Sequence, residues 1–458
     1  MIQKILEHFD PRNQPWMTRP SFSHELIHAL TFPVALAMVE GGVVGVFAKK
    51  AFGVSPMLFA TIMAAPMFAN LTSFAWARLA RGRPKVRFIN ALQLGTLASI
   101  AAIALLPTGG IGPGVLTLLV ILSRCLQTGI VTIRSTVWRM NYPRRVRARI
   151  TGRLALINSM IIATAPLIGY AVLDWNIEAF RVIYPASILI AMVGVGAFSR
   201  VRLRGERDLL RYEAGPTARP QPHGIPAPIY EYDPAAPNHS FWDVLRRDHH
   251  FRRYMLWQFI AGASNMMSEV VVIYLIVDLT SKAKIRFEYL TSIMLATAIP
   301  MLLAMLTLPL WARYLDRVHV TRFRGRQGWF WISNQLGNWL GAATGSLTIL
   351  GIARVLHGVA RGGGMLAWNL GHNDFADRRM VTLYMGIHVT LTGVRGAVVP
   401  FLAMLLFVGW PGGTIPVLGW TAPTFDGIGH HLFLATAALA LIGEIGFVSL
   451  NRRIEKTG

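Results

Sequence analysis

The segment WARLARGRPKVRF at residues 76–88 has a counterpart 235 positions later, WARYLDRVHVTRF at residues 311–323. Both segments open with Trp-Ala-Arg, close with Arg-Phe, follow a long apolar run and carry a cluster of positive charge. A basic segment after an apolar run is typical of a cytoplasmic loop between two membrane-spanning helices. Its recurrence in the same form indicates that the chain contains two related halves.

Further matches at nearly the same spacing support this duplication. MVEGGVVGVF aligns with MSEVVVIYLI, which places Glu40 over Glu269, and SRCLQTG aligns with ARVLHGV, which places Arg124 over Arg354. The order of these matches is the same in both halves. Each half is expected to hold six spans, so both halves enter the membrane from the same side. This pattern predicts a parallel repeat of two six-helix bundles.

The composition indicates a membrane protein. Of 458 residues, 53% are hydrophobic and only 15% are charged, whereas about a quarter of the residues in a soluble domain are charged. The net charge of +23 would favour nucleic-acid binding in a soluble protein. Here the Lys and Arg residues gather in loops, as in membrane proteins, and we expect no nucleic-acid partner. The single cysteine, Cys125, excludes an intramolecular disulfide.

Apolar runs near twenty residues, the length needed to cross a bilayer, predict an all-α membrane protein with twelve spans. The first six are expected at 27–48, 55–78, 88–107, 113–138, 151–173 and 179–199. The second six are expected at 254–278, 288–312, 328–346, 347–371, 381–408 and 428–450.

These spans divide the chain into five parts. The N-terminal segment 1–26 holds either a short surface helix or a frayed terminus, and bundles at 27–199 and 254–450 flank the polar linker 200–253. A C-terminal tail, 451–458, ends the chain. Just after the linker, a short amphipathic helix is predicted to turn three apolar side chains towards the membrane: Phe241, Trp242 and Leu245.

The loops indicate the orientation. Arginines crowd the loops 78–87, 139–153 and 313–326, whereas 108–112 and 409–427 contain no Lys or Arg. Basic loops stay in the cytoplasm. Both termini and the linker are therefore expected in the cytoplasm, and we expect a multi-pass protein of the cell inner membrane.

The two six-helix halves, the long linker and the basic loops after spans 2 and 8 resemble the major facilitator superfamily over essentially the whole chain. In that family the loop reads roughly Gly-x-x-x-Asp-Arg-x-Gly-Arg-Arg and helps to latch a cytoplasmic gate. Asp316 and Arg317 resemble its acidic and basic core. The first half has Arg81 in the place of Asp316 and keeps only the glycine and basic part, Gly82 and Arg83. The resemblance implies a gating loop in each half, with the acid missing from the first.

Span 4 is similar to the family's Arg-x-x-Gln-Gly motif through Arg124, Gln127 and Gly129, with one extra residue before the glycine. APLIG in span 5 is partly similar to a Gly-Pro-x-x-Gly signature of proton-coupled exporters. The family resemblance implies a transporter, but these motifs leave the direction of transport open.

Charged residues inside spans are the candidate functional groups, because each ionised side chain at the bilayer centre costs about 2.5–3.5 kcal/mol. In the superfamily, spans 1, 4, 7 and 10 line the central cavity. These spans hold Glu40, Arg124, Arg134, Glu269, Arg354 and Arg361. At about 1.5 Å of rise per residue, Glu40 lies at nearly the depth of Arg124. The same holds for Glu269 and Arg354, which predicts two Glu–Arg pairs, acting either in proton coupling or as static struts.

The remaining candidates have two interpretations each. Arg134 and Arg361 have no acid at an equal depth, and unpaired guanidinium groups favour an anionic substrate, although Arg134 could also snorkel to the membrane surface. Asn265 lies one turn before Glu269. His388 and Arg395 share a helix face, where a proton relay or simple packing is possible.

The sequence thus predicts a secondary active transporter that moves a small solute, preferably an organic anion, by alternating access coupled to H⁺. We expect a monomer in the lipid bilayer with no metal and no cofactor. No enzyme motif is found, and an enzyme is not expected. Two alternatives stay open: a non-transport assembly or delivery factor of the same fold, and a membrane enzyme.

Overall fold

The computed structural model describes residues 10–214, 241–376, 380–415 and 420–457. The predicted surface helix at the N-terminus and the Pro-rich part of the linker lie outside these residues. The chain forms two compact units. The first comprises Met1–Val44 and Ala65–Tyr232, and the second comprises Gly45–Ala64 and Asp233–Gly458. The units therefore follow the two predicted halves except for residues 45–64, which belong with the second half.

The described residues of the first half form helices joined by short turns and loops. Its α-helices are α2 (Arg19–Ala37), α3 (Gly41–Phe52), α4 (Pro56–Leu71), α5 (Ser73–Leu79), α6 (Lys85–Ile103), α7 (Gly112–Asn141), α8 (Arg144–Leu173), α9 (Phe180–Ser199) and α10 (Glu206–Ala214). Short 3₁₀ turns are η1 (Pro11–Asn13), η2 (Trp16–Thr18) and η3 (Ile177–Ala179).

The second half repeats this pattern and adds a small hairpin. Its helices are α11 (Phe241–Arg247), α12 (His249–Lys282), α13 (Glu288–Ile293), the π-helical η4 (Met294–Ala298), α14 (Ile299–Leu315), α15 (Val320–Thr344), α16 (Leu347–Leu370), η5 (Gly371–Asp374), α17 (Val381–Val408), η6 (Gly429–His431) and α18 (Leu432–Thr457). Strands β1 (Gly413–Ile415) and β2 (Trp420–Ala422) pair antiparallel between α17 and α18, with Gly413 opposite Ala422.

The helix order confirms the all-α fold of two six-span halves. Three spans are composite: α2 with α3, α4 with α5 across a bend of 43°, and α13 with η4 and α14. Within the described residues, nine helices, or ten with the bent pair as one span, are long and apolar enough to cross a membrane. Helices α15 and α16 complete the twelve; they are long enough but carry more polar side chains.

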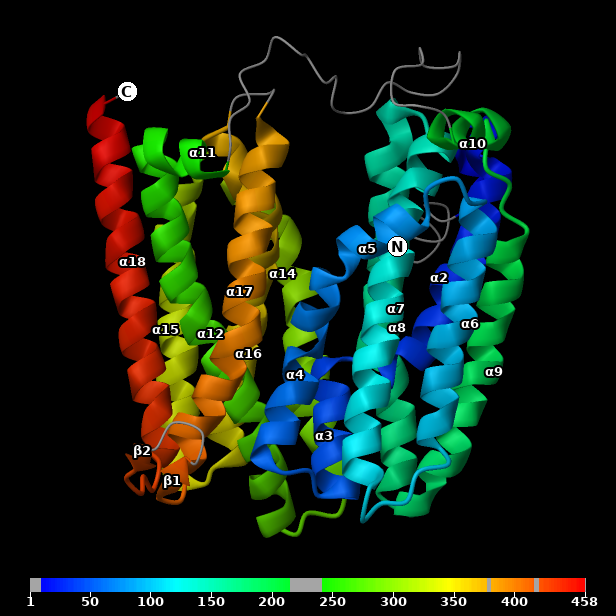
Figure 1. Cartoon of the computed structure of the whole chain (residues 1–458). Helices are drawn as coiled ribbons and strands as arrows, with labels where there is room; N and C mark the ends of the chain where they lie inside the picture. Colours follow the sequence, from blue (N-terminus) through cyan, green and yellow to red (C-terminus); the bar gives the residue numbers. More distant parts are fainter. Residues whose placement is uncertain (1–9, 215–240, 377–379, 416–419, 458) are drawn as a thin grey trace. The chain divides into compact units, whose positions relative to one another are not determined.

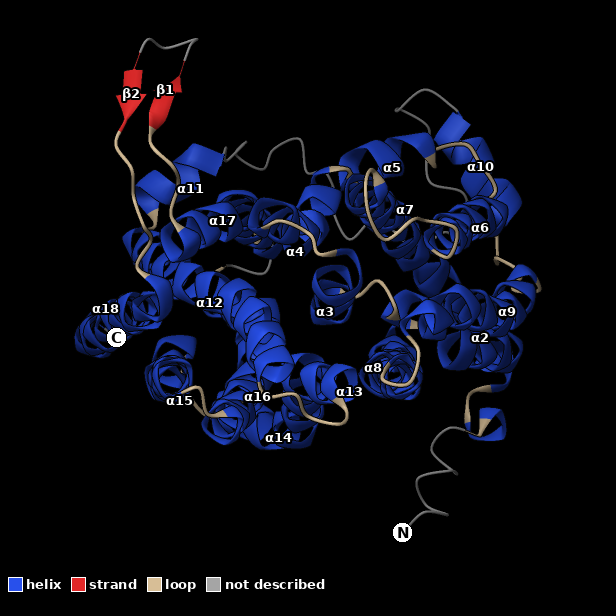
Figure 2. Cartoon of the chain, turned by 90° about the horizontal axis from the view of Figure 1, so that it is seen from below, coloured by secondary structure: helices blue, strands red, loops and turns tan. Residues whose placement is uncertain are grey.

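Each unit is held together by long helix–helix contacts. In the first, α2 packs against α8 and α9, and α6 packs against α7 and α9 (Figure 1). In the second, α16 packs against α14 and α15, while α18 packs against α12 and α15 (Figure 2). One face of each span packs against neighbouring helices. The other face exposes leucine, isoleucine and valine side chains, which suit a lipid environment.

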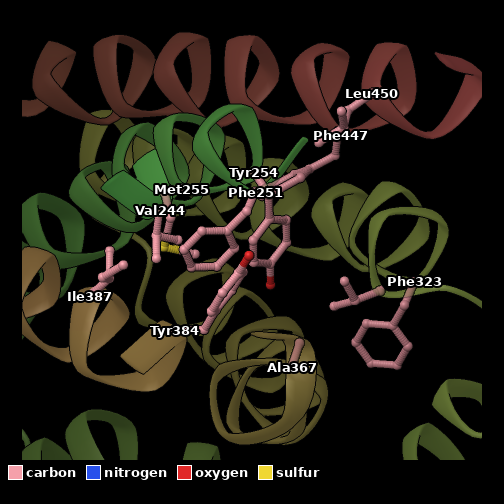
Figure 3. Close-up of a cluster of buried hydrophobic side chains, with 11 residues drawn as sticks. Val244, Phe251, Tyr254, Met255, Phe323, Ala367, Tyr384, Ile387, Phe447 and Leu450 are labelled. Carbon is pink, nitrogen blue, oxygen red and sulfur yellow. The ribbon is translucent and has the colours of Figure 1, made fainter. Parts of the chain in front are cut away.

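A cluster of buried aromatic and aliphatic side chains packs between helices of the second unit (Figure 3). The rings of Phe251 and Tyr384 lie 4.3 Å apart, and the Tyr384 hydroxyl donates to Asp248, the N-cap of α12. Helix α11 packs against this cluster through the buried Val244. The predicted surface helix therefore exists, but Phe241 and Leu245 pack against protein, and Trp242 is the exposed side chain of the predicted three.

The repeated tryptophans have the same function in both halves. A Cβ on Gly129 of α7 would lie 3.0 Å from the Trp76 ring, and a Cβ on Gly363 of α16 would lie 2.9 Å from the Trp311 ring. Trp311 also donates to the carbonyl of Val359 at 2.8 Å. Each tryptophan ring therefore packs against a glycine, which has no side chain, on the helix two spans later in its half. This packing explains why the Trp-Ala-Arg segment recurs.

Filling these two glycine sites is expected to destabilise the protein. Gly363→Leu forces the Trp311 ring away from α16, and overpacking of this kind costs about 1–3 kcal/mol. Gly129→Leu acts in the same way on Trp76. The thermal unfolding midpoint in detergent measures the effect. Gly386→Leu is the control, because nothing lies within 4 Å of a Cβ at that helical position; an equal shift in the control would contradict the packing explanation.

Candidate functional site

The first span is interrupted at its candidate acid. Helix α2 ends at Ala37 and α3 begins at Gly41, so Glu40 lies in the break. Carbonyl groups at such a helix end need partners from elsewhere. Arg124 of α7 supplies one: its guanidinium lies 2.8 Å from the Glu40 carboxylate and also donates to the carbonyl of Val39. The Glu40 side chain stays 35% exposed.

The pair in the second half is held more firmly. Arg354 of α16 donates to both carboxylate oxygens of Glu269 at 2.8 and 3.0 Å. It also donates to the carbonyls of Leu295 at 2.9 Å and Ala296 at 3.0 Å. Both carbonyls belong to the π-helical turn η4, and such turns often mark functional positions. The Arg354 side chain is 0% exposed. The structure therefore brings together both predicted Glu–Arg pairs. Arg354 makes more hydrogen bonds than Arg124 does.

A histidine extends the second pair. The Nδ1 atom of His357 lies 3.6 Å from the Glu269 carboxylate, and its ring meets Trp331 edge-on. One turn further along α16, Arg361 is exposed and has no ion-pair partner among the described residues. Residues three and seven positions after Arg354 share its helix face. His357 was not among the predicted site residues, although its position three residues after Arg354 places it on the same helix face.

Arg134 has a buried partner. Two of its nitrogens donate to Glu25 at 3.2 and 3.0 Å, and Trp138 and Tyr142 donate to the same carboxylate. Glu25 is fully buried. The prediction that Arg134 lacks an acid is therefore wrong. The first span begins earlier than expected, with α2 starting at Arg19, so Glu25 was placed outside the membrane.

A cavity of about 190 Å³ lies beside this cluster, between α2, α7 and α8. Its polar lining residues are His28, Gln127, Arg134, Trp138, Asn158 and Ser159. A side-chain nitrogen of Gln93 contacts Nε2 of His28 at 2.7 Å. The other ring nitrogen of His28 and the side-chain oxygen of Gln127 are buried without a hydrogen-bond partner among the described residues. Unsatisfied buried groups are costly, so this cavity is suited to a polar ligand.

The other predicted site residues lie in helix contacts. Gln335 of α15 reaches Asn265 of α12 at 3.4 Å, and Asn338 donates to Ser268 at 3.2 Å. These side-chain amides of α15 therefore link it to α12. His388 is buried and its ring lies 5.5 Å from that of Trp368, with no hydrogen bond among the described residues.

Arg395, on the same face of α17 as His388, donates to the carbonyl of Gln258 in α12 at 2.7 Å. That bond fixes α17 against α12. The geometry therefore agrees with a packing role for this face.

The predicted gating loop of the first half contacts an acid from the linker. Glu213 of α10 accepts from the backbone N–H of Gly82 at 2.7 Å and from the buried Lys85 ammonium. Arg81 donates to the backbone carbonyl of Glu213 at 3.2 Å. The loop has no acid in its own sequence, and only the folded chain brings Glu213 to it. Arg83, also part of the predicted loop, lies with its guanidinium 5.4 Å from the Phe88 ring.

The predicted gating loop of the second half has a different arrangement. Asp374, from η5, accepts from the N–H of Val320 at 2.7 Å and so caps the start of α15. Asp316 is the C-cap of α14, and with Arg317 and Asp374 it lines a surface pocket. Burial lowers the pKa of His319 in this loop below its ordinary value, and the nearby Asp374 partly opposes that shift. Each loop is thus tied to an acid from outside it.

Removal of the Glu213 carboxylate is expected to release α10 from the loop. Glu213→Gln leaves the buried Lys85 ammonium without an anion, and loss of a charged hydrogen bond costs about 1.5–3 kcal/mol. Thermal unfolding in detergent measures this loss. The charge exchange Glu213→Lys with Lys85→Glu is expected to restore part of it. Asp208→Asn on the same helix serves as the control, and equal destabilisation by that control would contradict a specific role for Glu213.

Two lysines near the end of α3 fix residues 45–64 within the second unit. Lys49 lies 2.6 Å from the Asp278 carboxylate and sits over the Tyr274 ring. Lys50 lies 3.0 Å from the Glu288 carboxylate. These contacts join the first half of the sequence to the second and were not predicted.

Comparison with known proteins rests on structure alone, because no family model and no curated protein sequence matches the chain. The nucleoside transporter NupG superposes with a TM-score of 0.66 at 9% identity, covering 95% of this chain and 99% of that one. An inward-facing bacterial homologue of the human lysosomal transporter Spinster gives 0.60 at 14% identity, covering 97% and 98%. A POT family transporter in complex with 5-aminolevulinic acid gives 0.62 at 14% identity, covering 96% and 97%. At these identities the likeness is one of fold.

Proposed function

We propose, from the major facilitator fold that this chain shares with solved transporters, that it is a secondary active transporter of a small solute. The observation that carries the proposal is the Glu40–Arg124 pair, an ionised pair placed at a break in a spanning helix. Interrupted helices are common at the substrate and ion sites of transporters. A purely structural pair would not need a break in the helix or a partly exposed acid.

Coupling to protons follows from exchange of partners at Arg124. When an anionic substrate takes the guanidinium of Arg124, Glu40 loses its counter-ion. A carboxylate that loses a neighbouring positive charge holds a proton more readily, so in this proposal Glu40 takes up H⁺. Release of the substrate returns Arg124 to Glu40, and the proton leaves. The number of charges in the site stays constant through the cycle, and rocking of the two bundles would expose it alternately to each side.

An organic anion is the substrate class that the charges favour. Arg361 is exposed on the α16 face that also carries Arg354 and His357, and the planar guanidinium fork suits carboxylate or phosphate. Arg134 is neutralised by Glu25, so the adjoining cavity offers hydrogen bonds rather than net positive charge.

Proton movement in sealed vesicles tests the proposal. Purified protein is reconstituted with a pH-sensitive dye inside, and organic anions, organic cations and neutral sugars are added separately. We expect a fluorescence change with the anions. Silence with all three classes, from protein shown to be folded, would count against proton-coupled transport and favour the assembly-factor alternative.

Arg361→Ala is expected to weaken binding of the active anion about tenfold to a hundredfold, because a hydrogen bond to a charged group contributes about 1.5–3 kcal/mol. Isothermal titration in detergent measures the affinity. Arg200→Ala, at an exposed arginine outside the candidate site, is the control. Unchanged affinity in Arg361→Ala would remove this residue from the site.

A further inference from the structure

A groove on the second unit lies apart from the candidate transport site. It runs between α15 and α18 and has a volume of about 630 Å³. Its lining residues are Trp329, Leu441, Glu444, Ile445, Val448, Ser449, Arg452, Arg453 and Lys456. Trp329 belongs to α15 and the others belong to α18, and none belongs to the Glu–Arg pairs.

Two glycines of α15, which have no side chain, create space between α15 and α18. A Cβ on Gly328 would collide with the carboxylate of Glu444, and a Cβ on Gly325 would lie 3.3 Å from Val448. Glu444 fills part of that space, is only 3% exposed and has one carboxylate oxygen without a partner among the described residues. The groove floor is therefore built into the packing of α15 against α18.

The chemistry of the groove changes in order along α18. Leu441 and Ile445 are 39% and 60% exposed, the Ser449 hydroxyl follows, and the exposed Arg452, Arg453 and Lys456 come last. At a rise of about 1.5 Å per residue, the distance along the α18 axis from the apolar Leu441 to the basic Lys456 is roughly 20 Å.

The α15 wall of the groove and the nearby acids agree with this change from apolar to basic along α18. Trp329 of α15 is 58% exposed, and tryptophans with this exposure are typical of the membrane–water boundary. Glu444 lies about 12 Å along the axis from Arg452. Glu455, the other acid of this helix end, accepts from Asn451 at 2.9 Å. Glu455 directly precedes Lys456, so this helix end carries three basic side chains and one acid and keeps a net positive charge.

We propose that this groove binds one anionic diacyl phospholipid. The acyl chains lie over Leu441 and Ile445, the glycerol region meets Ser449 and Trp329, and the phosphate contacts Arg452, Arg453 and Lys456. Basic pockets between spanning helices are suited to anionic lipid headgroups. Guanidinium groups bind phosphate through paired hydrogen bonds, while a zwitterionic lipid would bring its own cation beside them.

Native mass spectrometry of the detergent-solubilised full chain tests the proposal. Phosphatidylglycerol and phosphatidylcholine with identical acyl chains are added at equal concentration, and the bound fraction of each is counted. We expect about tenfold more bound phosphatidylglycerol. The double variant Arg452→Gln, Arg453→Gln is expected to lose this preference, whereas Arg246→Gln, Arg247→Gln, which removes two exposed arginines of α11, keeps it.

A second variant separates a built groove from simple charge attraction. Ser449→Phe fills the groove and leaves every basic residue in place, so it is expected to reduce phosphatidylglycerol binding as strongly as the double variant. Retained binding in Ser449→Phe would overturn the proposal in favour of attraction at the surface. Displacement of the lipid by glycerol 3-phosphate would overturn it in favour of a free phosphate site. Equal binding of both lipids would overturn it altogether.

Discussion

Glu40→Gln is expected to abolish substrate-driven proton movement and to leave the protein folded. Glutamine keeps the shape of the side chain and can still accept a hydrogen bond from Arg124, but it cannot carry a proton at neutral pH. The partly exposed position of Glu40 and the second bond of Arg124 to the Val39 carbonyl make the fold tolerant of this change. The dye signal in vesicles is expected to fall at least tenfold.

Exchange of labelled for unlabelled substrate across the vesicle membrane is the companion measurement. It requires substrate binding and alternation but no net proton transfer, so Glu40→Gln is expected to retain it. Loss of both signals would mean that Glu40 is needed for binding, and retention of both would place the proton carrier elsewhere. His357, beside Glu269, would then be the next candidate.

Glu269→Ala is expected to have the largest effect on stability. It leaves the Arg354 guanidinium buried with two backbone carbonyls and no counter-ion, and removal of one partner from a buried pair costs about 3–5 kcal/mol. Part of the Glu269 side chain is exposed, 23%, which places the expected loss at the lower end of that range. Thermal unfolding in detergent and folded yield measure the loss.

The matched control is Glu40→Ala, which breaks the equivalent pair of the first half. A smaller loss is expected there, because Arg124 is 10% exposed and Glu40 is 35% exposed. The double variant Glu269→Ala, Arg354→Met is expected to recover part of the stability, since removing both charges leaves none unpaired. Equal losses in the two single variants would contradict the proposed difference between the pairs.

The fold was predictable because it depends on coarse properties of the sequence. Apolar length, basic loops and the repeat that aligns Arg124 with Arg354 are sufficient for two six-helix halves. The two Glu–Arg pairs were predictable for a related reason, since depth along a helix follows from counting residues. The role of these pairs remains a prediction.

The features that were missed depend on contacts between distant parts of the chain. Glu25 was not predicted as a site residue, because the start of a span depends on packing as well as on hydropathy. Glu213 lies in a linker that reads as polar, and only the folded chain places it at Gly82. The contact of Lys49 with Asp278 joins residues 229 positions apart, and no local pattern encodes it.

Residues 45–64 are synthesised early, but their contacts in the second unit can form only after the second half of the chain has been synthesised. They belong to the second unit, yet the partners of Lys49 and Lys50 on α12 and α13 follow more than 200 residues later in the chain. At a synthesis rate of about 5–20 residues per second, the interval is roughly 10–45 seconds. During that time this segment is in the membrane without Asp278 and Glu288. The second unit therefore cannot be completed from its own half of the gene product, and a chain cut in the linker would yield a C-terminal fragment that lacks part of its own structure.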